Sequence, residues 1–162
     1  MALVLVSTPG SASANTYALL AEAEAYALTL TVKDDWLAAD DPTKNAALVQ
    51  ATRGLDNLRW KGLKSTVITQ PLQWPRAWVT DRDGFALASD TIPQKIKDAT
   101  CEFAIRIVAD DRAADAGGLV YKSLELGSLK LGDVSRHPVP ASVMEMVGEF
   151  LNSSSGPSME LA

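Results

Sequence analysis

The sequence predicts a small, mainly α-helical domain, a bundle of about four helices with one β-hairpin and a flexible carboxyl-terminal tail. Three observations lead to this fold class. The chain has 162 residues, 47% of them hydrophobic and 22% charged, as expected for one globular domain. Apolar residues recur every three or four positions over most of the chain, and strand-like alternation is confined to residues 119–134. We expect one domain over residues 1–151 and a tail over residues 152–162.

End signals place the first two helices. The first is predicted over residues 16–30, with Asn15 as its N-cap. The second is predicted over residues 41–62, because Asp41 is a good N-cap and the proline that follows it suits the first helical position. Between these helices, residues 34–40 are predicted to form a turn or a single helical turn.

The second half of the chain begins with a long loop. Residues 63–91 contain prolines and glycine without sustained periodicity, and a loop of this length in a small domain is often functional. A long amphipathic helix is predicted over residues 93–111. A hairpin follows over about residues 119–134, and a last helix begins after Pro140.

The composition argues against an enzyme and against a metal site. The chain has one cysteine, Cys101, and one histidine, His137, so it cannot form an internal disulfide or a Cys/His zinc site. Residues 81–84 (DRDG) begin like a calcium loop but lack its later ligands, which favours a plain turn. No glycine-rich phosphate loop is present. We expect no catalytic activity, no metal and no cofactor.

Charge is unevenly distributed in this acidic chain, which has a formal net charge of −5. Residues 1–42 hold six acids and one base, and residues 83–162 hold twelve acids and seven bases. Residues 53–82, the basic island, hold six bases and two acids. The net charge argues against a dedicated nucleic-acid binder. Any DNA contact is expected to be weak and electrostatic, made by Arg53, Arg59, Lys61, Lys64 or Arg76.

Three tryptophans lie in the basic island, namely Trp60, Trp74 and Trp78. Aromatic side chains among cations are typical of a surface that binds single-stranded nucleic acid. The alternative is structural packing, with Trp60 covering the core at the end of a helix and Trp74 fixing the long loop to the helices. We favour packing over base stacking. The longest amino-terminal apolar run ends at Val6, too short to span a membrane, and no membrane partner is expected.

Several short motifs resemble a family of tailed-bacteriophage head-tail adaptors, also called head completion or connector proteins, some relatives of which are labelled DnaT-like single-stranded DNA-binding protein. The matching segments span about residues 14–150. They are ANTY at 14–17, AEA at 21–23, ALVQATRGLDNLRWKG at 47–62, QWPR at 73–76, DRDG at 81–84, IP at 92–93, IKDA at 96–99 and KSLELG at 122–127.

The resemblance implies a structural virion protein at the head-tail interface, assembled in the host cytoplasm. It would form a ring of about twelve copies beneath the portal protein. The ring would extend the channel for packaged DNA and meet a tail or stopper protein. The alternative is a single-stranded DNA-binding protein of phage replication, which the acidic charge makes less attractive. The expected contacts to portal or a neighbouring subunit are Leu124, Leu126, Leu129, Leu131, Met159 and Leu161.

Overall fold

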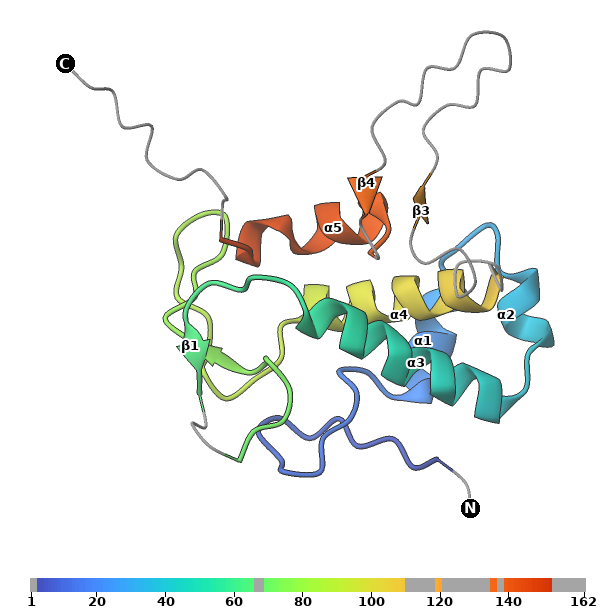
Figure 1. The fold of residues 1–162 in the computed structure, drawn as a ribbon, viewed down its shortest axis with the longest axis horizontal. Helices are drawn as coiled ribbons and strands as arrows, with labels where there is room; N and C mark the ends of the chain where they lie inside the picture. The colour runs from blue at the N-terminus through green and yellow to red at the C-terminus, as the bar shows by residue number, and fades with distance from the viewer. Residues whose placement is uncertain (1–2, 66–68, 110–118, 121–134, 137–138, 153–162) are drawn as a thin grey trace, which may run out of the picture.

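The computed structural model describes residues 3–65, 69–109, 119–120, 135–136 and 139–152. These residues form a mainly helical small domain, as the sequence predicts (Figure 1). The helices are α1 (Leu20–Ala27), α2 (Asp34–Ala38), α3 (Asp41–Asp56), α4 (Gln94–Ala109) and α5 (Ala141–Val147), followed by the 3-10 turn η1 (Gly148–Phe150). The strands are β1 (Leu63–Lys64), β2 (Arg76–Ala77), β3 (Leu119–Val120) and β4 (Ser135–Arg136).

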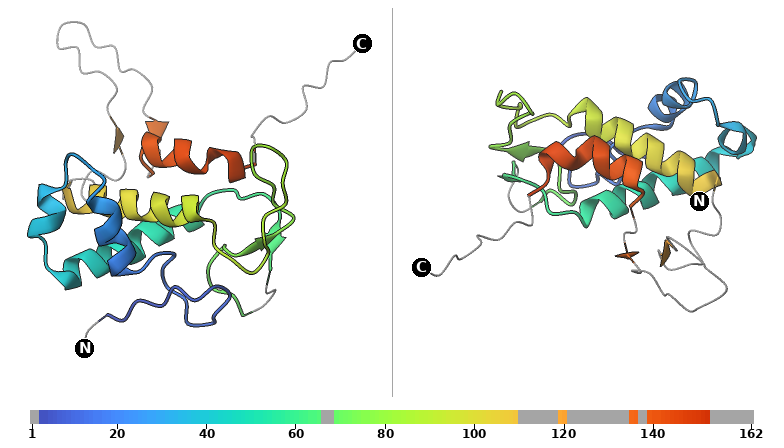
Figure 2. Two further views of the ribbon diagram at one scale, coloured as in Figure 1. Left: turned by 180° about the vertical axis from the view of Figure 1, so that it is seen from behind. Right: turned by 90° about the horizontal axis from the view of Figure 1, so that it is seen from above.

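Helix α4 is the centre of the bundle. It contacts α1, α2, α3 and α5, which surround it (Figure 2). The predicted apolar face is buried at Ile96, Ala99 and Phe103. Cys101 on the same helix is also buried, and burial raises the pKa of its thiol to about 12. Because most of the other helices depend on this one for burial, α4 holds the bundle together.

Helix α3 is shorter than predicted. Its N-cap is Asp40, one residue before the predicted cap, and the Asp40 carboxylate accepts a hydrogen bond from the Thr43 N–H at 3.0 Å. The helix ends at Asp56 instead of continuing to residue 62. The chain folds back there, because the Trp60 indole N–H donates to the carbonyl oxygen of Leu55 at 3.1 Å and so occupies one of the carbonyls left at the end of the helix.

Helix α1 begins four residues later than predicted, at Leu20, and Asn15 is not its N-cap. The Asn15 side chain instead holds the amino-terminal segment, since its amide N–H donates to the Val4 carbonyl and its oxygen accepts from the Val6 N–H, both at 2.8 Å. Asparagine is common at the N-cap of a helix. Here the polar atoms of Asn15 instead bond the backbone of the amino-terminal segment, which belongs to no strand.

The predicted long loop contains two short antiparallel pairings. Strand β1 pairs with β2, with Leu63 opposite Ala77 and Lys64 opposite Arg76. A bridge between Thr80 and Ala86 closes the turn at residues 81–84. In that turn the Asp81 carboxylate accepts hydrogen bonds from the N–H groups of residues 83 and 85, so the acidic motif builds a turn, as predicted.

Strands β3 and β4 also pair antiparallel, with Leu119 opposite Arg136 and Val120 opposite Ser135. A hairpin is therefore present, although its second strand lies at residues 135–136, just after the predicted range. The expected portal contacts Leu124, Leu126, Leu129, Leu131, Met159 and Leu161 lie outside the described residues. Asn152, assigned to the tail, belongs to the fold because its side-chain amide donates to the Trp60 carbonyl at 3.1 Å.

Among the described residues, no helix has the length and apolar character needed to cross a membrane.

Candidate nucleic-acid interface

Two of the three tryptophans in the basic island are packed in the core, as predicted. Trp60 is 4% exposed and Trp74 is 1% exposed. The Trp74 ring lies edge-on between Trp60 and Phe150, with ring centroids 5.6 Å from each. This aromatic cluster joins the segment after α3 to η1, which follows α5, and neither indole is available for stacking on a base.

Two hydrogen-bonded side chains, Tyr17 before α1 and Asp56 at the end of α3, fix the segment that carries Trp74. The Tyr17 hydroxyl donates to the Asp56 carboxylate, and the Gln73 N–H lies 3.1 Å from both the Tyr17 oxygen and an Asp56 oxygen. Burial raises the pKa of the Asp56 carboxyl, although the hydrogen bonds from Tyr17 and Gln73 oppose this. Burial also raises the pKa of Tyr17 well above its ordinary value. These groups are structural because they hold the backbone of residues 73–74 in place.

Arg76, named from the sequence as a possible DNA contact, is buried among backbone carbonyls. It is only 7% exposed. Its guanidinium donates to the carbonyl oxygens of Lys61 at 2.6 Å, Gly62 at 2.7 Å and Gln73 at 3.2 Å. An arginine in a basic sequence suggests phosphate binding. Here the planar guanidinium of Arg76 uses its N–H groups to bind three backbone carbonyls.

Gly62 lies directly against the strand that precedes Trp78. Its φ is +69°, and a Cβ at this position would lie 2.2 Å from the carbonyl oxygen of Ala77 and 2.8 Å from a methyl carbon of Val79. Only glycine combines this backbone conformation with so close an approach. The contact fixes where residues 77–79 run across the end of the molecule.

Trp78 is the exposed tryptophan of the basic island. Its side chain is 81% exposed, and its φ of +58° lies in the left-handed region, which is unfavourable for a bulky residue. This conformation breaks the usual strand alternation, because Arg76 and Val79 are both buried while the indole between them points to solvent. A large aromatic side chain held in solvent on strained backbone is a feature that often marks a functional site.

Cations lie on residues 59–64, a segment that includes β1 and pairs with the strand before Trp78. Arg59 is exposed, and Lys61 and Lys64 are partly exposed. The Lys61 ammonium donates to the Glu149 carbonyl at 2.7 Å and the Lys64 ammonium to the Gln70 carbonyl at 3.2 Å, which leaves both with N–H groups to offer. We call Arg59, Lys61, Leu63, Lys64, Trp78 and Arg82 the basic end. Arg53 is exposed on α3, outside this set.

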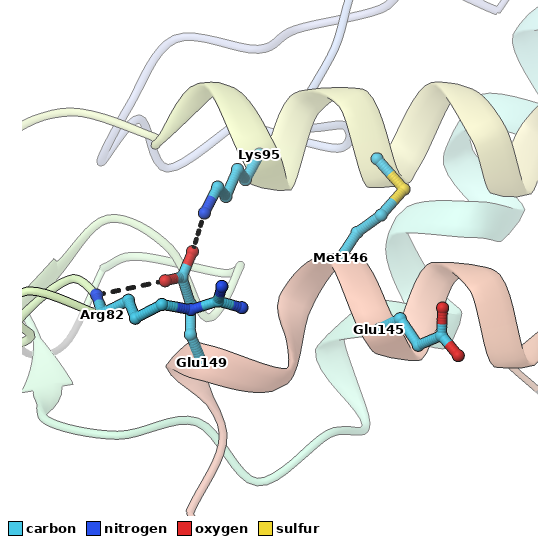
Figure 3. Close-up of a pocket in the computed structure, with 5 residues that line it drawn as sticks. All are labelled: Arg82, Lys95, Glu145, Met146 and Glu149. Carbon is cyan, nitrogen blue, oxygen red and sulfur yellow. Dashed lines mark hydrogen bonds and ion pairs between the residues drawn. The ribbon is translucent and has the colours of Figure 1, made fainter.

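Glu149 attaches the turn at residues 81–84 to the helices (Figure 3). Its carboxylate accepts the Arg82 backbone N–H at 3.1 Å and pairs with the Lys95 ammonium. Glu149, Arg82 and Lys95 line an open cavity of about 250 Å³, together with Glu145 and Met146. Its mixed charges give the cavity no preference for an anion. The hydrogen bond to Glu149 fixes the backbone of Arg82 at the margin of the basic end.

The comparisons with known proteins give one match. The family described as "Putative DnaT-like ssDNA binding protein" matches residues 1–161. The chain belongs to this family. No curated protein and no solved structure gives a significant match. The family description is the label that the resemblance gives to some relatives of the head-tail adaptors, and the match lends no support to the adaptor role itself.

For this family member, the sequence predicts the basic island but not how its side chains divide between core and surface. Arg53, Arg59, Lys61 and Lys64 keep some exposure, while Arg76 is buried. Sequence reasoning counted Arg82 in the basic island without naming it as a contact, and it missed Lys95; the carboxylate of a distant residue, Glu149, brings the two together. It also gave no reason to separate Trp78 from the other two tryptophans. Gly62 could have indicated a close backbone contact, but the sequence does not show which strand it contacts.

Proposed function

We propose that this protein binds single-stranded DNA without sequence preference, through the basic end. The observation that carries the proposal is Trp78, an indole 81% exposed on left-handed backbone between segments that bear cations. In this proposal the indole stacks on a base while Arg59, Lys61 and Lys64 contact phosphates. The family description supports it. The proposal revises the expectation of a purely electrostatic contact. That expectation assumed that the tryptophans are packed, whereas Trp78 is exposed and can stack.

The expected affinity for DNA can be estimated from the single stacking contact and the phosphate contacts. Stacking of one base on an aromatic side chain contributes about 1–3 kcal/mol. About three phosphate contacts would give a salt dependence with a slope near −2 on logarithmic axes, since each contact to a single strand contributes about −0.7. The acidic remainder of the chain repels DNA, so the contact should be short and sensitive to salt.

The test is a titration of a fluorescently labelled oligonucleotide, read by anisotropy at several salt concentrations. Trp78→Ala should weaken binding by about tenfold or more through loss of stacking, and Trp78→Phe should retain most of it. Arg59→Gln should weaken binding and reduce the salt slope by about 0.7.

Arg106→Gln is the matched control for charge, because Arg106 is a half-exposed cation near the opposite end of α4. It should leave the affinity nearly unchanged. If Trp78→Ala binds as tightly as the wild type, or if Arg106→Gln weakens binding as much as Arg59→Gln, the proposed interface is wrong.

The head-tail adaptor is the second proposal, and it rests on the resemblance of the motifs at residues 47–62 and 73–84. It includes the ring, the portal and tail partners and a place in the virion. Co-sedimentation with purified portal protein tests it, and a chain that never associates with portal contradicts it. In both proposals the protein acts by binding rather than by catalysis.

A further inference from the structure

The two ends of the molecule carry opposite charges. At the end formed by α2 and the beginning of α3, four carboxylates are exposed, namely Asp34, Asp35, Asp40 and Asp41. Lys33 also lies there, with its ammonium donating to the carbonyl oxygens of Leu30 at 3.1 Å and Leu28 at 3.5 Å, and its single positive charge leaves this end net negative. This acidic end and the strand β1 of the basic end lie at opposite ends of the longest axis of the molecule (Figure 1).

Both ends also expose apolar side chains. At the acidic end, Leu28 is 68% exposed, Val32 79% and Leu37 52%. At the basic end, Leu63 is 59% exposed and Trp78 81%. Single exposed apolar side chains are ordinary. Three within ten residues at the acidic end, and Leu63 and Trp78 on the paired segments of the basic end, each beside charges of predominantly one sign, are typical of a contact surface.

We propose that the acidic end of one copy docks on the basic end of a second copy. The carboxylates at residues 34–41 would face Arg59, Lys64 and Arg82 of the neighbour. Leu28, Val32 and Leu37 would cover Leu63 and Trp78. This contact goes beyond the proposed DNA binding and can form without DNA. It uses the same basic end, so a second copy and DNA would compete for that surface.

The charges select the head-to-tail arrangement. A symmetric pair made from either end alone would place like charges against each other, and such juxtaposition is strongly unfavourable. A contact between unlike ends leaves a free end of each kind, so further copies can add, giving an open chain or a closed ring. The small number of apolar side chains places the contact in the weak class, which buries less than about 1,200 Å².

The experiment is sedimentation equilibrium of the full chain without DNA, at low and high salt. At low salt the average mass should rise with protein concentration past that of a dimer, and high salt should reduce the association. Asp34→Lys with Asp35→Lys removes the net negative charge of the acidic end, and Arg59→Glu with Arg82→Glu removes the net positive charge of the basic end. Each should associate at least tenfold more weakly than the wild type.

Mixing the two double variants is the decisive step. Each supplies the end that the other lacks, so association should be stronger in the mixture than in either variant alone. Circular dichroism checks that both are folded. Should the lysines in the first turn of α2 unfold it, Val32→Lys replaces that variant, with Val32→Asp as the control that weakens association less. A wild type that stays monomeric at low salt, or a mixture that stays monomeric, overturns the proposal.

Discussion

Trp74 and Trp78 are four residues apart in one basic stretch, yet they have opposite surroundings. Trp74 is 1% exposed between two aromatic rings, and Trp78 is 81% exposed. The segment around Trp74 is held by Tyr17, Asp56 and the Arg76 guanidinium. After Arg76 the backbone adopts the left-handed conformation at Trp78, and the Trp78 indole points to solvent. The comparison shows that the end of the domain combines a rigid support with a side chain held in solvent.

The largest expected effect is on the buried member of the pair. Trp74→Ala should lower the free energy of unfolding by about 3–5 kcal/mol, because it leaves a cavity and removes two edge-on aromatic contacts. Urea unfolding measures this. Trp78→Ala is the control and should change stability by less than about 0.5 kcal/mol. Similar losses in the two variants would remove the contrast between core and surface.

The second effect concerns Arg76, whose guanidinium holds the backbone next to Trp78. Arg76→Lys should cost about 2 kcal/mol or more, since one ammonium cannot replace a planar guanidinium that donates to three carbonyl oxygens. Arg59→Lys, a change at an exposed position, should have almost no effect on stability. If Arg76→Lys is as stable as the wild type, the guanidinium does not organise this end.

The third effect isolates the backbone at residue 78. Trp78→Gly should be more stable than Trp78→Ala by about 1 kcal/mol, because glycine adopts a φ of +58° without the steric cost that any Cβ imposes. Both variants lack the indole, so both should bind DNA equally weakly. A more stable alanine variant would show that this residue is not left-handed in solution.

The smallest effect is a dependence on pH from Asp56. Because burial raises its pKa in the folded state, its contribution favours folding below the unfolded pKa and is lost as pH rises through the folded pKa. The stability of the wild type relative to Asp56→Asn should therefore fall as pH rises above about 4. Urea unfolding at a series of pH values measures this difference. A difference that grows in favour of the wild type would mean that the hydrogen bonds to the carboxylate outweigh burial.

The helices were the predictable part of this fold. The pattern of apolar residues locates α3 and α4, because their buried faces follow the helical period. The ends were less predictable, since Asp40 and Asp41 are equally good caps by residue type and the sequence gives no reason to prefer Asp40. Asn15 shows the same limit, because its side chain bonds a segment distant in sequence.

The candidate site was predictable as a region and not as a set of side chains. Residue type and spacing give a basic island with three tryptophans. Which arginine is buried depends on where carbonyls are left without donors, and which indole is exposed depends on the close contact of Gly62 with Ala77. Both are properties of a strand pairing only two residues long, which leaves no period in the sequence.

The exposure of a single indole has an optical consequence. Trp36, Trp60 and Trp74 are each 4% exposed or less, whereas Trp78 faces solvent. A water-soluble collisional quencher therefore reaches one emitter of four, and the emission that it removes reports on Trp78 alone. Whatever covers the basic end, a nucleic acid or another copy of the chain, would shield that emitter. The unlabelled protein thus carries its own reporter for both proposed contacts.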